Sequence, residues 1–392
     1  MIVAFTKDWD DVPTCTTHIL REMGKTEPVL WVGSIGTRKP SAASSKDVRR
    51  ILRRVWRGIL PPEHKEHHLY VLHPLLIPKA TSAWARRVNC ILFRWYVARF
   101  VRIARRGGDD QPIAYWCFVP NAVDLLPERG HDCKVVYYVA DDWTAFHNLD
   151  GVWMKAKEDA LVERSDVIFA TSEYLVEKLR KICAGLGREG TEWVVHMPHG
   201  VDHGLFEKAL DRSVGLPPEL EGMSQPIIGF YGNLHPWVDF ALIEKLARAR
   251  PTFNFVLIGE DYGAPESLQA CSNVHLLGRR EHGVLVDYCR GFDAAMIPYD
   301  MRQERMESVN PVKTKELLSA GVPVVSAMVP ALAGYGDDVL LCREAGQWLE
   351  ALEHQIAKDA AERAAISARM RGETWAAKVQ AIRMRVGFWG KC

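Results

Sequence analysis

Short apolar runs alternate with amphipathic stretches from one end of the chain to the other, and this alternation limits the fold more than any other feature of the sequence. Apolar runs of about four to eight residues bounded by turn signals are typical of buried strands, and apolar residues every three to four positions are typical of helices. Strands that alternate with helices build parallel sheets. The sequence therefore predicts an α/β fold.

The first half of the chain contains the clearest strand candidates. They are expected at residues 1–5, 29–32, 69–72, 113–118, 134–139, 167–171 and 193–197. Helices between them are expected at 14–23, 84–106 and 153–164. This half should form one sheet with helices on its faces.

The pattern restarts after residues 211–225, which are rich in Pro, Gly and charge and have no sustained period, as in a linker. Strands are then expected at 227–231, 254–258, 274–277, 294–297 and 322–326, and helices at 239–249, 284–290 and 312–320. A last helical stretch, 345–385, is long enough to pack across both halves.

A chain of 392 residues is too long for one ordinary core, so we expect two domains. The predicted boundaries are 1–205 for the first domain and 206–370 for the second, with a C-terminal helix at 371–392 that packs back on the first. Ligands of such open sheets bind at the carboxyl ends of the strands, so the chemistry is expected in a cleft between the domains.

Cysteine usage and hydropathy indicate the compartment. The nine cysteines are scattered, without a Cys-x-x-Cys pair, which favours a reducing environment. The chain begins with a strand-like segment rather than a signal peptide, and no apolar run approaches the roughly 18 residues of a membrane span. We expect an unsecreted protein without a transmembrane helix.

The formal net charge of +1 conceals an uneven distribution. Residues 38–106 carry 17 Lys and Arg against 3 acidic residues, a net +14, which leaves −13 on the remainder. Arginines interleaved with aromatic residues in this stretch suit an anionic membrane surface. The arginines expected at that surface are Arg49, Arg50, Arg53, Arg54, Arg94, Arg99 and Arg102. The alternative is a solvated basic face; nucleic acid also fits the charge, but no recognised nucleic-acid module accompanies it.

The most informative segment is 310–325. Asn310 is a good N-cap and Pro311 a good first helical residue, so a helix is predicted to begin there. Its N-terminus and Lys313 would form an anion site, and Glu316 would accept hydrogen bonds from a ribose or sugar hydroxyl. The alternative is that Lys313 and Glu316 form only an exposed i,i+3 ion pair.

This segment, Pro-x-Lys-x-x-Glu followed by Ala-Gly-x-Pro-Val-Val, resembles the donor-site motif of nucleotide-sugar glycosyltransferases of the GT-B type. The resemblance continues at 229–233, 237–239, 257–259, 278 and 298–299. It implies two Rossmann-like domains that face each other across a cleft. The residues it places against the donor are Gly232, Asn233, Gly259, Arg279, Tyr299, Pro311, Val312, Lys313 and Glu316.

Segments 93–96, 136–143 and 199–203 are similar to bacterial exopolysaccharide enzymes of the xanthan-pathway glucuronosyltransferase and teichuronic acid glycosyltransferase types. This likeness implies a UDP-sugar donor, a lipid-linked saccharide acceptor, and a cytoplasmic protein peripheral to the inner face of the plasma membrane. It suggests glucuronate as the sugar, with Arg302 or Arg305 as a candidate partner for its carboxylate. Oligomeric state stays open.

Asp141 falls on the position that supplies the catalytic base in this resemblance, and a carboxylate at the end of a strand suits that task. Asp142 is interpreted mainly as an N-cap for the turn at 143–144, with a second assignment at the cleft edge. Thr14, His18 and His199 are also assigned to the acceptor or cleft edge. Helix capping explains Thr14 equally well.

Two departures from the pattern affect the chemistry. Retaining relatives carry a second Glu at the position of Ser308, whereas Glu307 lies one residue out of register, so inversion is favoured. Arg279 stands where the xanthan-type enzyme has an acid, so contacts to the base or ribose should differ. The short match Asp8-Trp9-Asp10 arises easily by chance, and we assign no metal and no cofactor besides the nucleotide-sugar co-substrate.

Two alternatives remain. A sugar-nucleotide epimerase shares the two-domain architecture and would convert its nucleotide sugar without an acceptor. A catalytically silent, membrane-associated saccharide-binding subunit would bind a nucleotide sugar without turnover, or would not bind it.

Overall fold

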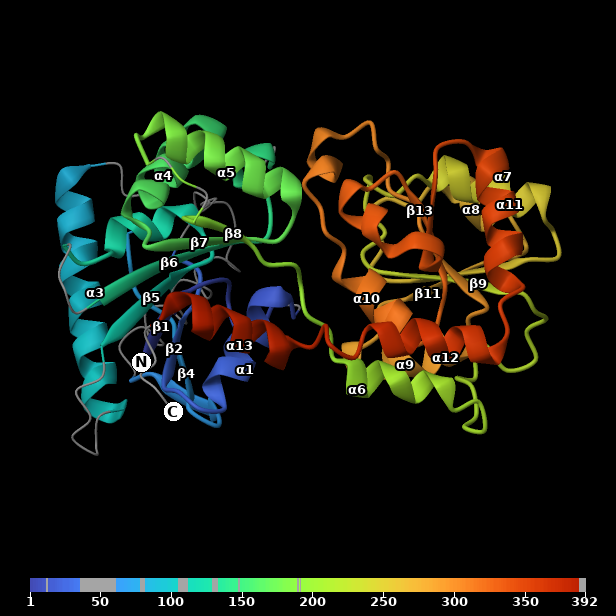
Figure 1. Ribbon diagram of the computed structural model, residues 1–392, viewed down its shortest axis with the longest axis horizontal. Coiled ribbons are helices and arrows are strands. Elements are labelled where there is room, and N and C mark those ends of the chain that lie inside the picture. The colour runs from blue at the N-terminus through green and yellow to red at the C-terminus, as the bar shows by residue number, and fades with distance from the viewer. Residues whose placement is uncertain are drawn as a thin grey trace, which may run out of the picture. The chain divides into compact units, whose positions relative to one another are not determined.

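The computed structural model describes residues 1–11, 13–35, 61–77, 82–104, 112–128, 133–146, 149–188, 190 and 192–387. The chain divides into two compact units, residues 1–198 together with 378–392, and residues 199–377. Each unit contains a sheet with helices on both faces (Figure 1). The predicted α/β fold is confirmed.

The first unit is built on an eight-stranded sheet in the order β3-β4-β2-β1-β5-β6-β7-β8. Its strands are β1 Ile2–Phe5, β2 Val29–Val32, β3 Glu63–Glu66, β4 Leu69–Leu72, β5 Ile113–Cys117, β6 Cys133–Val139, β7 Val167–Ala170 and β8 Val194–His196. All neighbours pair in parallel except β3 and β4, which are antiparallel. The central strands are buried along their whole length, because a parallel sheet is covered on both faces.

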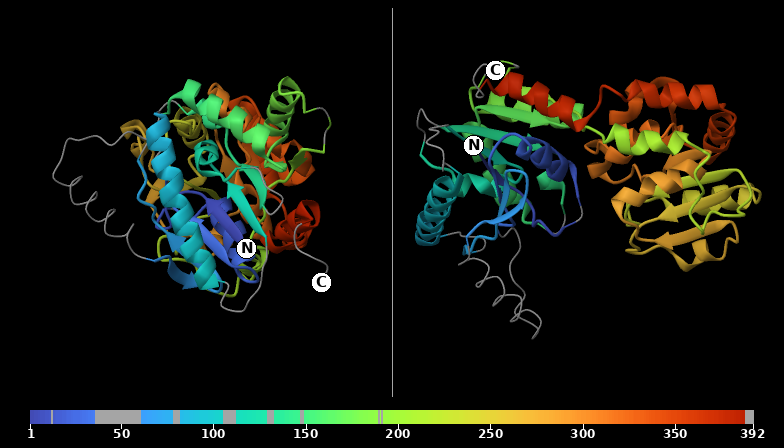
Figure 2. Two further views of the ribbon diagram at one scale, coloured as in Figure 1. Left: turned by 90° about the vertical axis from the view of Figure 1, so that its left-hand side faces the viewer. Right: turned by 90° about the horizontal axis from the view of Figure 1, so that it is seen from below.

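Helices cover both faces of this sheet. They are α1 Cys15–Gly24, α3 Ala83–Ala104, α4 Gly151–Arg164, α5 Glu173–Gly185 and α13 Trp375–Val386. One face packs against α3, α4 and α5 through an apolar cluster that includes Phe93 and Leu179. α1 and α13 lie on the opposite face (Figures 1 and 2), where Arg383 of α13 forms an ion pair with Glu27 at 2.8 Å.

The second unit is built on a six-stranded parallel sheet in the order β11-β10-β9-β12-β13-β14. Its strands are β9 Ile227–Tyr231, β10 Asn254–Ile258, β11 Val274–Gly278, β12 Ala294–Ile297, β13 Val324–Ala327 and β14 Val339–Cys342. The chain builds outward from β9 first to β10 and β11, then returns to place β12 on its other side. The space between β9 and β12 is therefore the topological switch point, where ligands of open α/β sheets bind.

The helices of the second unit also lie in two layers. They are α6 His203–Phe206, α7 Phe240–Ala249, α8 Glu266–Gln269, α9 Leu285–Gly291, α10 Val312–Ser319, α11 Ala345–Ile356 and α12 Ala360–Arg369. α6, α9, α10 and α12 cover one face, and α7, α8 and α11 the other (Figure 1). α10 follows β12, so its N-terminus lies at the carboxyl edge of the sheet.

Two predictions about the connections are wrong. Residues 211–225 do not link the units, because they pack on the second one: the Arg290 guanidinium donates to the Asp211 carbonyl at 3.0 Å, and Leu220 is buried. The long helix expected at 345–385 is broken into α11, α12 and α13. The break before α12 has a cause, since Asp359 and Glu362 form a reciprocal capping box that starts a new helix.

The observed unit boundaries lie after Pro198 and before Lys378, whereas the sequence placed them after residues 205 and 370. β3, β14 and α5 were not predicted from the sequence. β3 is a short polar edge strand, whose exposed charged residues lack a strand pattern. Among the helices of the described ranges, none is both long and apolar enough to cross a membrane.

Candidate functional site

The carboxyl edge of the second sheet brings the predicted donor residues together. Gly232 follows β9, Tyr299 follows β12, and α10 begins after the same β12 loop. Lys313 projects from the first turn of α10 and places its ammonium 4.4 Å from the centre of the Phe230 ring and 5.6 Å from that of Tyr299. Within the described ranges no carboxylate lies within ion-pair distance of this ammonium, so its charge faces aromatic rings and the switch point.

Gly232 is required at this point for two reasons. Its φ of 136° is a conformation that favours glycine, and a Cβ there would lie 2.1 Å from the Lys313 ammonium. Gly259, directly after β10, packs against Gly232. A Cβ added at position 259 would lie 2.0 Å from the Gly232 carbonyl oxygen. The absence of side chains at both positions therefore lets the two backbone segments and the Lys313 ammonium approach one another closely. Asn233 is exposed beside them.

The N-terminus of α10 differs from the prediction by one position. Pro311 takes the N-cap place with an extended ψ of 113°, so the first helical residue is Val312, and Asn310 precedes the cap instead of forming it. The prediction that Asn310 caps the helix is wrong, because Pro311 does not adopt the helical ψ. Val312 and Lys313 nevertheless contribute the first-turn amides, which an α-helix leaves without internal partners.

Glu316 lies one turn further along α10 and is buried. Its two carboxylate oxygens are engaged separately: Oε2 accepts from the Tyr231 hydroxyl at 3.0 Å, and Oε1 lies 2.7 Å from His282 Nε2. The alternative interpretation of an exposed Lys313–Glu316 ion pair is therefore wrong. Hydrogen bonding to Glu316 raises the pKa of His282 despite its burial, which acts in the opposite direction, and the charges of Glu316 and Asp202 add to the increase.

His282 is a site residue that the sequence analysis missed. It lies in the turn after β11, 34 positions before Glu316, and only the parallel order of the sheet brings the two together. No local motif marks it. The Phe206 ring packs against its imidazole edge to face, with the ring centres 5.6 Å apart.

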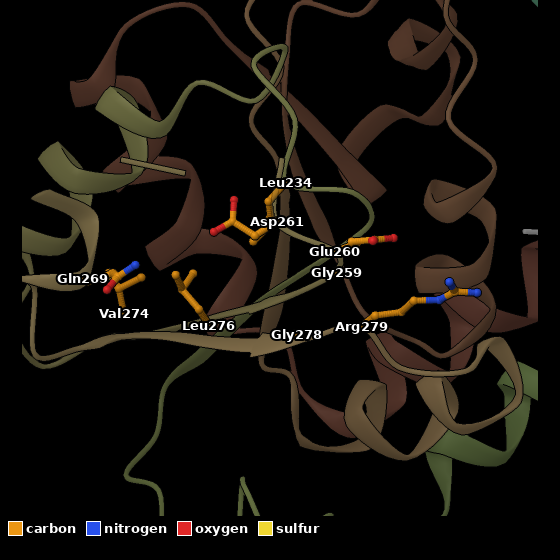
Figure 3. A pocket seen from close by; sticks show the side chains of 9 residues that line it. All are labelled: Leu234, Gly259, Glu260, Asp261, Gln269, Val274, Leu276, Gly278 and Arg279. Carbon is orange, nitrogen blue, oxygen red and sulfur yellow. The ribbon is translucent and has the colours of Figure 1, made fainter. Parts of the chain in front are cut away.

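An open pocket of about 690 Å³ lies beyond the carboxyl end of β10 and along β11 (Figure 3). Its lining consists of Leu234, Gly259, Glu260, Asp261, Gln269, Val274, Leu276, Gly278 and Arg279. Glu260 and Arg279 stand at one end and Gln269 at the other (Figure 3). Since Gly259 lines the pocket and also abuts Gly232, the pocket adjoins the Lys313 site.

The two arginines considered for a uronate carboxylate already have interactions. Arg302 is exposed and donates to both carboxylate oxygens of Asp300, at 2.7 and 3.0 Å. The Arg305 guanidinium lies 4.6 Å from the ring centre of Trp237, which stacks on His235. Ser308 is buried and donates its hydroxyl to the Arg305 carbonyl at 2.8 Å, whereas Glu307 is exposed.

In the first unit, Asp141 and three of the predicted acceptor residues, Thr14, His18 and Asp142, follow strands β1 and β6 at the carboxyl edge of the sheet. Asp141 follows β6 and is partly exposed, and α1 begins nearby after β1. The pKa of the Cys15 thiol at the start of α1 is raised to about 12, by burial first and then by the negative charge of Asp141. Asp141 thus lies near the helix turn that contains Thr14 and His18.

Thr14 is the N-cap residue of α1, and its amide donates to the Thr17 hydroxyl at 3.1 Å. The capping interpretation of Asp142 is confirmed as well: Asp142 Oδ1 accepts from the Thr144 amide at 2.9 Å and from the Thr144 hydroxyl at 2.6 Å. Lys178 also donates to this oxygen, at 2.7 Å.

His199 is buried in the second unit and packs beside Trp375. Its carbonyl accepts from the buried Lys315 ammonium at 2.7 Å, and Lys315 also pairs with Glu373. Gly200 lies against Trp375 so closely that a Cβ at this position would lie 2.8 Å from the tryptophan. Residues 199–200 therefore pack against α10 and residues 373–375 within the second unit.

The basic region is described only in part. Arg49, Arg50, Arg53 and Arg54 lie outside the described residues. On α3, Arg94 and Arg102 are exposed, and the guanidinium of the partly exposed Arg99 lies 5.4 Å from the Trp95 ring centre. Phe93 and Phe100 face the core.

The outer side of α3 also carries apolar side chains that the sequence analysis did not place there. Trp84, Ile91 and Trp95 are 70%, 68% and 51% exposed. They share that side with the exposed Arg87, Arg94 and Arg102. We call these six residues the α3 outer face.

Comparison with known proteins agrees with this geometry. Residues 225–358, which contain the donor-site elements of the second unit, match the family described as Glycosyl transferases group 1. A Bacillus subtilis protein named teichuronic acid biosynthesis glycosyltransferase TuaH is 29% identical over 214 residues, which are 50% of this chain and 51% of TuaH. The chain thus matches about half the length of this curated relative.

Solved structures share the fold over nearly the whole chain. The Escherichia coli trehalose-6-phosphate protein bound with UDP-2-fluoro glucose has a TM-score of 0.67 at 12% identity, covering 99% of both chains. Anabaena Alr3699/HepE in complex with UDP and glucose has a TM-score of 0.63 at 14% identity, with the same coverage. The fold is GT-B, as the sequence resemblance implied.

Proposed function

We propose that this chain is a glycosyltransferase that moves a sugar from a UDP-sugar to a lipid-linked saccharide. The donor binds in the second unit and the acceptor in the first. The Lys313 site is the observation that supports the proposal most strongly. Its ammonium lies over two aromatic rings, and the first turn of α10 lies beside it at the topological switch point. The site lies within the residues that match the group 1 glycosyl transferases. The UDP-2-fluoro glucose bound in one similar structure and the UDP bound in another support a nucleotide-sugar donor.

The donor diphosphate binds at Lys313 and the first-turn amides of α10. A helix N-terminus attracts anions through its free N–H groups and its dipole, and a lysine in the first turn adds a full charge. The nucleoside occupies the neighbouring pocket, where Arg279 and Glu260 offer donor and acceptor groups. A ribose or sugar hydroxyl donates to the Glu316 carboxylate, which His282 and Tyr231 hold in place.

Asp141 acts as the general base in the transfer step. An acceptor hydroxyl attacks the anomeric carbon of the donor and loses its proton to the Asp141 carboxylate. The bond from the anomeric carbon to the phosphate oxygen breaks, and the nucleoside diphosphate departs with the electron pair. Lys313 and α10 stabilise the developing negative charge. Direct displacement inverts the anomeric centre, in agreement with Ser308 at the position where retaining relatives have Glu.

The α3 outer face places the first unit on the inner, anionic leaflet of a membrane, where a lipid-linked acceptor is found. Exposed tryptophans suit the headgroup level of a bilayer, and each cation near anionic lipid contributes roughly 1 kcal/mol. Trp84, Ile91 and Trp95 supply the apolar contact, and the three arginines supply the charge. The side chains of core residues such as Phe100 are not needed for it.

The enzyme test is incubation of the protein with labelled UDP-hexoses and UDP-uronic acids and a lipid-linked saccharide extract. The expected result is label in the lipid fraction and equimolar UDP, with less than a hundredth of the wild-type rate in Asp141→Asn. Full activity in Asp141→Asn would remove the assigned base. Conversion of the nucleotide sugar without acceptor would identify an epimerase, and binding without turnover would identify a silent subunit.

The membrane test is flotation with vesicles of phosphatidylcholine alone or with one third phosphatidylglycerol. Wild type should float with the anionic vesicles, and the Trp84→Ser/Trp95→Ser double variant should float several times less. Val152→Ser is the control, because Val152 is 84% exposed but lies on α4. Equal flotation with neutral and anionic vesicles would contradict the electrostatic part of this assignment.

A further inference from the structure

A buried polar network lies behind the carboxyl end of β6 and joins three elements of the first unit. Lys178, on α5, donates to Asp142 Oδ1 at 2.7 Å and forms an ion pair with Glu158 Oε2 of α4 at 2.8 Å. The other Glu158 oxygen accepts from the Tyr137 hydroxyl of β6 at 2.9 Å. Glu158 is 1% exposed and Asp142 is 7% exposed, so two buried carboxylates share the ammonium of Lys178, whose side chain is 21% exposed.

Asp142 and Lys178 are both charged at neutral pH. Burial alone would raise the pKa of Asp142, but hydrogen bonds from Lys178 and Thr144 and the lysine charge bring it below its ordinary value. Burial alone would lower the pKa of Lys178, but the charges and hydrogen bonds of Glu158 and Asp142 raise it. The groups that face Lys178 are therefore Asp142 and Thr144 from the turn after β6, and Glu158 from α4.

Asp141 is held between two anchor points. On one side, the Ala140 carbonyl accepts from the Thr171 hydroxyl at 3.3 Å, which joins the end of β6 to the end of β7. On the other side, Asp142 is fixed by Lys178 and by the Thr144 amide and hydroxyl. The single residue between these anchors is Asp141, so its backbone has little freedom while both are in place.

We propose that Lys178 is a positioning residue for Asp141, which it orients by anchoring the buried Asp142 carboxylate next to it. This inference rests on the proposed function, in which Asp141 takes the proton of the acceptor hydroxyl. Lys178 itself does not touch the reacting atoms. It fixes the turn that follows β6. Because two carboxylates contact the same ammonium, this position requires a cationic side chain.

The test compares Lys178→Met, Lys178→Arg and the control Lys181→Met in the full chain. Lys181 is on the same helix, but its side chain is 76% exposed and it pairs only at 3.6 Å with the exposed Glu177. The steady-state kcat of transfer, the KM of the UDP-sugar and the Kd of UDP are measured for each. Lys178→Met should lower kcat roughly ten- to hundredfold, since a misplaced catalytic group costs about that much. KM and Kd should change less than twofold, Lys178→Arg should restore most of the rate, and Lys181→Met should match wild type.

The pH profile separates positioning from general damage. Burial raises the pKa of Asp142 and Lys178 lowers it, so without the ammonium Asp142, beside the buried Glu158 carboxylate, takes up a proton at a higher pH than in wild type. The ratio of the Lys178→Met rate to the wild-type rate should therefore rise between pH 8 and pH 5.5. A ratio that stays constant across this range would overturn the proposal, as would a wild-type kcat in folded Lys178→Met.

A second variant decides the case if Lys178→Met does not fold. Asp142→Asn keeps the shape of the side chain and an oxygen for Thr144, but loses the charge that Lys178 holds. A severalfold loss of kcat at unchanged UDP affinity supports the positioning role, and an unchanged kcat overturns it. If wild type binds UDP but transfers no sugar, this result contradicts the proposed function and, with it, the positioning role of Lys178. If Asp141→Asn is inactive while Asp142→Asn is fully active, only the positioning role fails.

Discussion

Two lysines stand two positions apart in α10 with opposite surroundings, which makes them a matched pair for mutagenesis. Lys313 faces two aromatic rings at the edge of the sheet. Lys315 is 4% exposed in its side chain, donates to the His199 carbonyl at 2.7 Å and pairs with Glu373. We predict that Lys313→Met weakens donor binding without loss of stability, and that Lys315→Met lowers stability first.

The magnitudes follow from these contacts. A hydrogen bond to a charged group contributes about 1.5–3 kcal/mol, so Lys313→Met should raise the Kd of UDP roughly ten- to 150-fold. Removal of one partner of a fully buried ion pair costs about 3–5 kcal/mol, but the Glu373 side chain is 34% exposed and water can replace part of the interaction. We therefore expect about 2 kcal/mol of destabilisation for Lys315→Met.

Isothermal titration calorimetry with UDP gives the Kd, and urea titration followed by tryptophan fluorescence gives the free energy of unfolding. The Lys313→Met variant should unfold within about 0.5 kcal/mol of wild type. Wild-type UDP affinity in Lys313→Met would refute the diphosphate site. Equal loss of affinity in both variants, with no loss of stability in Lys315→Met, would refute the division of roles between the two lysines.

Three further outcomes are expected. Because the folded state raises the pKa of His282, its ion pair with Glu316 contributes its full stabilisation below the ordinary pKa of 6.5, and this contribution is lost as the pH rises through the higher folded pKa. The difference in unfolding free energy between wild type and His282→Gln should therefore shrink on the alkaline side of 6.5. Urea titration at several pH values measures this difference. Gly259→Ala should cost roughly 1–3 kcal/mol through its clash with the Gly232 carbonyl, whereas the control Gly283→Ala, which meets no atom within 4 Å, should not; equal urea midpoints would contradict this. EDTA should leave the transfer rate unchanged, since Lys313 and α10 provide the charge stabilisation, and abolition by chelation would count against that assignment.

Local sequence patterns were sufficient for much of the second unit. Strands at 227–231, 254–258 and 294–297 have the predicted bounds, because buried parallel strands are continuous apolar runs with clear ends. The segment around Lys313 was recognisable because its helix start at Pro311, its charge at Lys313 and its closing glycine at Gly321 lie within eleven residues. The error at Asn310 is small and local, since proline fixes φ but leaves ψ free to be extended.

Contacts between distant segments were not predictable in the same way. His282 reaches Glu316, and Lys178 joins Asp142 to Glu158, only because neighbouring strands deliver their following turns to one edge of a sheet. A lone histidine or a lysine in an amphipathic helix has no pattern that distinguishes it from a solvated residue. The outward direction of Trp84 and Trp95 was also missed, because tryptophan in a helix is normally assigned to the core.

The most direct test of the glycosyltransferase assignment is transfer of radiolabelled sugar. The purified chain is incubated with each labelled UDP-sugar of a panel, with and without a lipid-linked saccharide extract, and organic-phase label and free UDP are measured together. We predict that one donor gives acceptor-dependent label in the organic phase with one UDP released per sugar, and that Lys313→Met and Asp141→Asn both reduce it. UDP-sugar that binds to the wild type without acceptor-dependent label from any donor would contradict the assignment.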